Sequence, residues 1–212
     1  MEVNNSTSTT FVVKYLGFRT TSHLWGIKYT RNPVDEMVKQ AKMQLTSDKQ
    51  PLPLLKLQVS SAGIHVSPMP QNQNPSCPTG RFPIEAISYG VQDIVYTRVF
   101  AMIVVNESQK VTADSLPFRC HAFVCDSRET ARKLTIELAS AFEVYSKRVK
   151  GEGKDGGDAR STSSADGETD KGAVKKKKKF AIDLRSPEEI RKEAGAAGEG
   201  EPSEEFPDFS EA

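Results

Sequence analysis

The sequence predicts an α+β fold whose core is an antiparallel sandwich or partly open barrel closed by a C-terminal helix. Its segments follow the order strand, helix, about six strands and helix. Two strand-like runs, "RVFAMIVV" and "FRCHAFVCD", are apolar on both faces, as central strands covered on each side are. Globular character stops after the last helical pattern, so one domain is followed by a tail.

The first strand and the first helix have clear local signals. "FVVKYLG" alternates and is rich in β-branched and aromatic residues, which predicts a strand that ends at Gly17. In "NPVDEMVKQAKMQL", Asn32 is a good N-cap and Pro33 suits the first helical position. Helical spacing places one apolar stripe along this helix, formed by Val34, Met37, Val38, Ala41 and Leu45.

The strands that follow alternate with turn and loop signals. "LLKLQVSSAGIHVSP" predicts a hairpin that turns at "SAG", and the Pro/Asn-rich "MPQNQNPSCPTG" predicts a loop. Three further strands are predicted in "IEAISYG", "RVFAMIVV" and "FRCHAFVCD", separated by "VQDIVYT" and the polar "NESQKVTADSLP".

The last helix is predicted to begin at Asp126, with Glu129 three residues on in a capping-box arrangement. A helix of about 22 residues spans about 33 Å, long enough to cap the open end of a small barrel. Its apolar face is predicted to comprise Leu134, Leu138, Ala141, Phe142, Tyr145 and Val149.

Charge and composition divide the chain into three parts. We expect a disordered N-terminus over residues 1–9, a domain over residues 10–150 and a disordered tail over residues 151–212. Residues 1–150 carry 18 Lys+Arg and 12 Asp+Glu, whereas the tail carries 11 and 16 and contains few aliphatic residues. The domain is therefore mildly basic and the tail is acidic.

The sequence contains no catalytic or metal-binding pattern. "GEGKDG" has the GxGxxG spacing, but it follows a helix, whereas a dinucleotide site needs a strand before it. Cys120 and Cys125 are an odd number of strand positions apart and should face opposite sides. We expect no enzyme, no cofactor, no metal and no nucleic-acid partner. Without an apolar span or a signal peptide, we expect the chain to lie in the cytoplasm, with the membrane periphery as an alternative. We also expect a monomer.

Several motifs together resemble one known family. "FVVKYLG", "LPLLKLQVSSAGIHV", "FPIEAISYG", "RVFAMIVV", "FRCHAFVCDS" and "LASAFEVYSK" occur in the order seen in phosphotyrosine-binding (PTB/PID) domains of the Numb, Disabled and engulfment-adaptor type. The resemblance covers about residues 10–148. It implies a PH-like, partly open β-barrel of two near-orthogonal antiparallel sheets capped by the C-terminal α-helix.

The resemblance also implies a peptide site. In that family an Asn-Pro-x-Tyr peptide adds as a strand to the fifth sheet strand and lies beside the terminal helix. "IEAISYG" matches that strand, and the peptide's turn would lie at its end, where Gly90 and Gln92 leave room. Phe142 matches a groove-lining residue of the family; the alternative is a buried core residue, and both can hold because a groove wall is core on one side. The implied peptide-binding residues are Ile84, Ala86, Ile87, Ser88, Tyr89 and Gly90 on the strand, and Leu138 and Phe142 on the helix.

Lysines in the domain suggest an alternative function, the binding of phosphoinositides. In some relatives a basic patch on the first strand, first helix and hairpin binds phosphoinositide head groups, and each basic side chain near an anionic leaflet contributes about 1 kcal/mol. The corresponding residues are Lys14, Lys39, Lys42, Lys49 and Lys56, although the modest net charge of the domain favours an ordinary solvated face. In the tail, the run Lys175–Lys179 suits nuclear import or an anionic membrane, and "EEFPDF" is similar to short motifs read by endocytic adaptors.

The sequence thus predicts a non-enzymatic adaptor that binds Asn-Pro-x-Tyr-type peptides of receptor cytoplasmic tails, in receptor trafficking or signalling. The alternative is a PH-like phosphoinositide-binding module without peptide recognition. Phosphate recognition favours Arg forks, and the strand residues Arg98 and Arg119 have no assignable position against a ligand. We therefore expect an unphosphorylated peptide to suffice.

Overall fold

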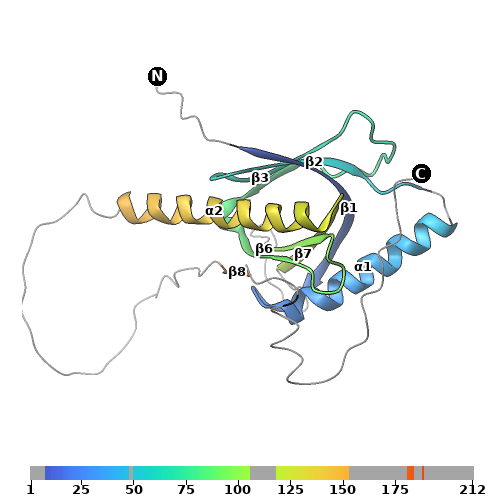
Figure 1. Ribbon diagram of the computed structural model, residues 1–212, viewed down its shortest axis with the longest axis horizontal. Helices are drawn as coiled ribbons and strands as arrows, with labels where there is room; N and C mark the ends of the chain where they lie inside the picture. Colours follow the sequence, from blue (N-terminus) through green and yellow to red (C-terminus); the bar gives the residue numbers. More distant parts are fainter. Residues whose placement is uncertain (1–7, 48–49, 106–117, 153–180, 184–187, 189–212) are drawn as a thin grey trace, which may run out of the picture.

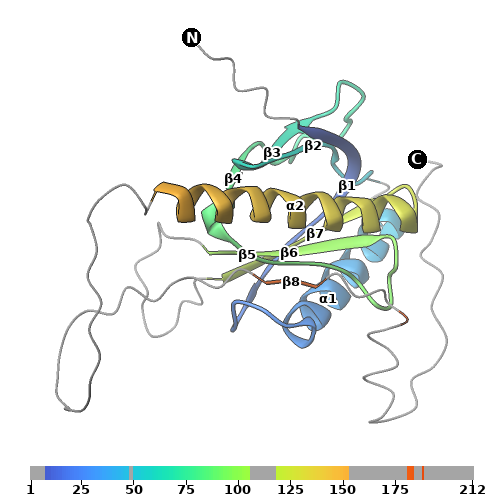
Figure 2. The same ribbon diagram turned by 60° about the vertical axis from the view of Figure 1, so that its left-hand side comes forward.

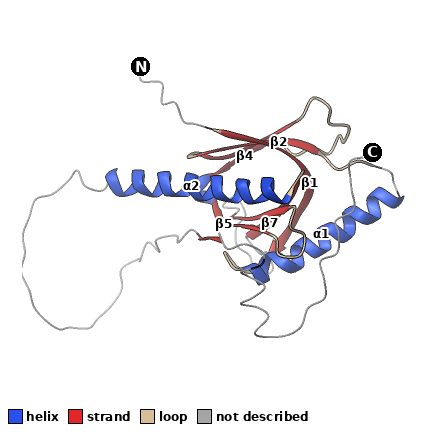
Figure 3. Ribbon diagram, in the orientation of Figure 1, coloured by secondary structure: helices blue, strands red, loops and turns tan. Residues whose placement is uncertain are grey.

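The computed structural model describes residues 8–47, 50–105, 118–152, 181–183 and 188. Within these residues, eight strands form one sheet in the order β4-β3-β2-β1-β7-β6-β5-β8, and two long helices pack against it (Figure 1, Figure 3). The strands are β1 (Thr9–Thr21), β2 (Leu54–Ser60), β3 (Gly63–Pro68), β4 (Gly80–Pro83), β5 (Ile87–Gln92), β6 (Val99–Val105), β7 (Phe118–Cys125) and β8 (Ala181–Asp183).

β1 is shared by the two halves of the sheet. Its first part pairs with β2 and its second part with β7, and a bulge between Tyr15 and Gly17 lies where the pairing changes. Gly17 has a φ of 114°, which favours glycine. The predicted strand end at Gly17 is therefore wrong, because the glycine bends the strand without ending it. The two halves face each other with α2 (Arg128–Glu152) between them (Figure 2), which confirms the PH-like α+β class.

α1 (Ile27–Ser47) begins earlier than predicted, and Pro33 lies inside it. Asn32 is therefore not its N-cap. A proline has no N–H for the carbonyl four residues back, here that of Tyr29. Thr21 Oγ1 donates to that carbonyl at 2.9 Å, so the acceptor is satisfied and the helix continues. The predicted stripe is buried at Val34, Met37, Val38 and Ala41, whereas Leu45 is half-buried.

The predicted hairpin is confirmed as β2 and β3. β4, which begins at the last residue of the predicted loop, pairs with β3 and adds a third strand. Gly63 has a φ of 119°, and a Cβ placed there would lie 2.1 Å from the carbonyl oxygen of Phe82. Only glycine permits this approach of β3 to β4.

The central strands are apolar on both faces, as predicted, because each face has its own core. The core on the α2 side includes Phe100, Phe123 and Leu134, and the core on the α1 side includes Val34 and Ile103. Cys125 lies in the first and Cys120 in the second, which confirms that they face opposite sides.

The N-cap of α2 is Ser127 and not the predicted Asp126. Ser127 Oγ accepts the backbone N–H of Thr130 at 3.0 Å, which satisfies one of the free donors of the first turn. The predicted apolar face is buried at Leu134, Leu138, Ala141 and Phe142 and partly buried at Tyr145, whereas Val149 is exposed.

Candidate functional site

β5 provides the candidate site: β6 occupies one of its edges, and among the described residues its other edge pairs only with the short strand β8. Ile87, Ser88, Tyr89 and Gly90 lie on β5, as predicted from the resemblance. Ile84 and Ala86 do not, since they belong to the 3₁₀ turn Ile84–Ala86 that precedes the strand. The structure therefore corrects the predicted pairing edge, which begins at Ile87.

The side chains of β5 are committed to the interior. A bulge between Ile87 and Tyr89 lets two residues that would share a face point to different cores, Ile87 toward α2 and Tyr89 toward α1. Ser88 Oγ contacts two carbonyl oxygens, those of Leu24 at 2.8 Å and Ile103 at 3.2 Å. A ligand at this edge would therefore bind mainly through backbone hydrogen bonds.

The helix wall beside β5 comes from α2. Leu138 is fully buried and Phe142 is 6% exposed, and both belong to the same core as Ile87. Phe142 is thus a core residue on the helix that flanks β5, so the two readings of this residue left open by the sequence are compatible.

The far end of β5 is closed by Gln92, contrary to the prediction that Gln92 leaves room there. Its side chain is buried, and Nε2 donates to the carbonyl oxygens of Thr97 at 2.6 Å and Arg128 at 3.0 Å. These bonds join the end of β5 to the first residue of α2. Gln92 Oε1 is buried without a hydrogen-bond partner among the described residues.

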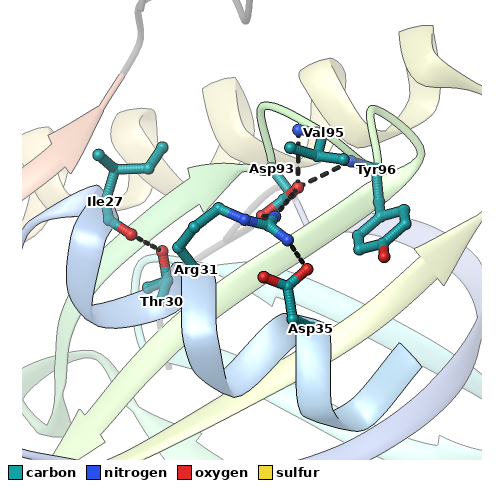
Figure 4. Close-up of polar contacts among 7 residues, drawn as sticks. All are labelled: Ile27, Thr30, Arg31, Asp35, Asp93, Val95 and Tyr96. Carbon is teal, nitrogen blue, oxygen red and sulfur yellow. Dashed lines mark hydrogen bonds and ion pairs between the residues drawn. The ribbon is translucent and has the colours of Figure 1, made fainter. Parts of the chain in front are cut away.

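A buried ion pair fixes the turn after β5 to α1 (Figure 4). Arg31 Nη1 lies 2.5 Å from both oxygens of Asp93, and Asp93 Oδ1 accepts the backbone N–H groups of Val95 at 2.9 Å and Tyr96 at 2.8 Å. Arg31 also pairs with Asp35. Burial raises the pKa of Asp93, and Arg31 and the two backbone N–H groups oppose that rise.

A second buried polar contact joins β1 to β7. The Tyr15 hydroxyl lies 2.9 Å from His121 Nδ1. Burial raises the pKa of Tyr15 and, with a contribution from Arg119, lowers the pKa of His121 to about 4. Both groups are therefore neutral, and a hydrogen bond joins the phenol to the imidazole.

The outer edge of β5 carries a strand from the tail. β8 pairs with β5 in parallel, with Tyr89 opposite Ala181, Gly90 opposite Ile182 and Val91 opposite Asp183. The predicted disorder of the tail therefore does not hold for these three residues, and α2 extends to Glu152. Sequence reasoning missed β8, because three residues beside a lysine run have no periodicity to detect.

A charged contact lies close to the same edge. Arg128 Nη2 lies 2.5 Å from Glu188 Oε1, and both side chains are about half exposed. The predicted site did not include Arg128. Its signal in the sequence was its place at the first turn of α2, beside the cap.

The other predicted cations lie elsewhere. Arg98 Nε donates to the Cys125 carbonyl at 3.1 Å, and the Arg119 guanidinium lies 4.9 Å from the Phe18 ring centre. Lys14 on β1 and Lys56 on β2 lie near each other in the sheet, because Lys56 pairs with Val12, two residues before Lys14. Lys39 and Lys42 lie on α1, which packs on β1, whereas Lys49 and the run Lys175–Lys179 fall outside the described residues.

Two searches of the described part of the chain were negative. No helix there is long and apolar enough to cross a membrane. No group of three or more His, Cys, Asp or Glu side chains there is placed to hold a metal ion.

An edge strand that accepts an extended segment beside a helix is the geometry of a strand-addition binding domain. The family model for the phosphotyrosine interaction domain (PTB/PID) matches residues 10–183, and the chain belongs to that family. Low density lipoprotein receptor adapter protein 1-B of Xenopus laevis is 31% identical over 159 residues, which are 74% of this chain and 46% of that protein. Its human counterpart, low density lipoprotein receptor adapter protein 1, is 30% identical over 134 residues, 63% of this chain and 39% of that protein.

The chain therefore spans less than half the length of these curated relatives. Among solved structures, the C-terminal phosphotyrosine interaction domain of APBB2 from mouse aligns with a TM-score of 0.49 at 16% identity. The alignment covers 66% of this chain and 90% of that one.

Proposed function

We propose that this protein is a non-enzymatic adaptor that binds Asn-Pro-x-Tyr-type peptides from receptor cytoplasmic tails by strand addition to β5. The observation that carries the proposal is the pairing of the outer edge of β5 with the extended segment Ala181–Asp183, which follows α2 in the sequence. Two relatives of this chain are named as adapters of the low density lipoprotein receptor, which supports a receptor-tail ligand. A place in the cytoplasm at the membrane periphery follows from such a ligand.

In this proposal the backbone edge of β5 and the neighbouring side chains have different roles. Backbone pairing along Ile87–Gln92 holds any extended peptide, because main-chain hydrogen bonds are indifferent to sequence. Discrimination then depends on side-chain contacts beside α2. Arg98, which precedes β6, and Arg119, on β7, both make contacts within the domain. This supports the expectation that an unphosphorylated tyrosine suffices.

The test is a fluorescence-anisotropy titration of the full chain with three matched peptides containing Asn-Pro-x-Tyr, Asn-Pro-x-phosphotyrosine or Asn-Pro-x-Ala. We expect binding that is lost with alanine and is no stronger with phosphotyrosine. Amide NMR shifts should change first along Ser88–Val91. Equal binding of the alanine peptide, or shifts confined to another surface, would refute the proposal.

Phe142→Val tests the helix wall. Because Phe142 is 6% exposed, we expect this change to lower the free energy of unfolding by about 2 kcal/mol. It should also weaken peptide binding in the folded protein. Val144→Ala, on the exposed face of the same helix, is the matched control and should leave the affinity unchanged.

Phosphoinositide binding is a second candidate function, favoured by the neighbouring positions of Lys14 and Lys56 on the sheet. Liposome sedimentation with and without phosphoinositide tests it. Lipid binding through lysines should collapse at high salt by screening, whereas strand addition should persist.

Recruitment of endocytic adaptors by the tail is a further proposal, tested by pull-down with Phe206→Ala and Phe209→Ala variants.

A further inference from the structure

Two features place one tail segment on the edge that the proposed function assigns to the ligand. β8 pairs with β5 over three residues, and Glu188, five residues after Asp183, contacts Arg128 at the start of α2. Gln92 also bonds to the backbone of Arg128, so the end of β5 and the start of α2 are adjacent. β8 and Glu188 therefore both contact the part of the domain formed by β5 and the first residue of α2.

We propose that this segment is an internal ligand that occupies the β5 edge in cis, so that an external peptide must displace it. One sheet edge presents one row of free N–H and C=O groups, and two segments cannot pair with it at once. Competition with an external peptide rests on the proposed function, whereas the occupancy of the β5 edge by this segment does not.

The chain permits this contact within one molecule. The 28 residues from 153 to 180 join α2 to β8 and could reach at most about 90–100 Å when fully extended. The whole of α2 is about 37 Å long at 1.5 Å per residue, so the connection is ample. A tethered segment acts at an effective concentration in the millimolar range, so even a weak segment competes with an external peptide.

The contact is also weak enough to be displaced. A three-residue parallel pairing makes few hydrogen bonds, and parallel pairs are slightly less stable per residue than antiparallel ones. The ion pair between Arg128 and Glu188 is half exposed and adds little. A longer peptide with side-chain contacts can therefore replace the segment, which suits regulation of ligand access.

The experiment changes only the backbone of the segment. Successive N–H groups of a strand point to opposite sides, so the double substitution Ala181→Pro and Ile182→Pro removes a donor that faces β5 whichever residue supplies it. The matched control is Ala196→Pro with Ala197→Pro, which adds the same prolines to the same tail. All variants are made in the full chain.

Two labelled probes separate the inference from the proposed function. One is a peptide of residues 178–190 of this chain, and the other is the Asn-Pro-x-Tyr peptide. We expect the double-proline variant to bind the 178–190 peptide about tenfold more tightly than wild type, with the control like wild type. Hydrogen exchange of alternate amides in Ile87–Gln92 should be faster in that variant, by a similar factor.

The outcomes are distinct. If the 178–190 peptide binds as described but the Asn-Pro-x-Tyr peptide binds no variant, the internal ligand stands and the proposed function fails. If the Asn-Pro-x-Tyr peptide binds wild type and double-proline variant equally, and β5 exchange is unchanged, the internal ligand is refuted. Protection of β5 that falls on dilution, with a dimer mass in light scattering, would also refute occupancy in cis.

Discussion

Replacing Asp93 should reveal how strongly the turn after β5 is tied to α1. Asp93→Ala removes the carboxylate that pairs with Arg31 at 2.5 Å and accepts two backbone N–H groups. Asp93 is 1% exposed and Arg31 17%, and loss of one partner of a buried pair costs about 3–5 kcal/mol. Asp93→Asn keeps an oxygen for the backbone donors and loses the charge, so it should cost about 1.5–3 kcal/mol.

Urea unfolding followed by circular dichroism measures these costs. The matched control is Asp35→Ala, which removes the exposed partner of the same Arg31 and should cost less than about 1 kcal/mol. A cycle that adds Arg31→Met to Asp93→Asn should give a coupling of about 1 kcal/mol or more. If Asp93→Ala costs no more than Asp35→Ala, the buried carboxylate does not secure the turn, and the reasoning fails.

Three further changes test other features. Gly63→Ala should cost more than about 2 kcal/mol, since its Cβ meets a backbone carbonyl of β4 at 2.1 Å, whereas Gly17→Ala, with a similar φ and open space, should cost about 1 kcal/mol in thermal unfolding. Because the pKa of His121 falls from 6.5 to about 4 on folding, the unfolded chain binds more protons between these values. Wild type should thus lose up to about 3 kcal/mol as pH falls from 6.5 to 4, a loss absent in urea titrations of His121→Asn. Arg128→Glu or Glu188→Arg alone should raise external-peptide affinity about twofold to fivefold in anisotropy, and the exchanged pair should return it to the wild-type value.

Most of the fold was predictable because its elements bury faces of the expected period. The hairpin, β6 and β7 carry alternating or doubly apolar patterns, and their buried residues follow those patterns. The errors lie where a tertiary contact overrides a local signal. Pro33 is a valid first-turn residue by local rules, yet Thr21 satisfies the carbonyl that it leaves free, and the helix starts at Ile27.

The site was predictable only in part, for a related reason. The strand "IEAISYG" was recognised, but a 3₁₀ turn takes its first three residues, and no apolar pattern distinguishes that turn from a strand start. Arg128 and the segment Ala181–Asp183 come together only through the path of the chain between them. Sequence spacing holds no information on that encounter, whereas the pairing of β5 with β8 shows it directly.

The direction of β8 follows from the position of α2. Arg128 lies beside Gln92 at the end of β5, and Phe142, 14 residues on, shares a core with Ile87 at the start of the strand. Fourteen helical residues rise about 21 Å, and β5 spans about 17 Å, so α2 runs antiparallel along the whole strand. The chain therefore leaves α2 beyond the start of β5, and a segment that returns along the edge toward Arg128 runs parallel to it. An external peptide has no such connection, so the direction of β8 places no constraint on the direction in which that peptide binds.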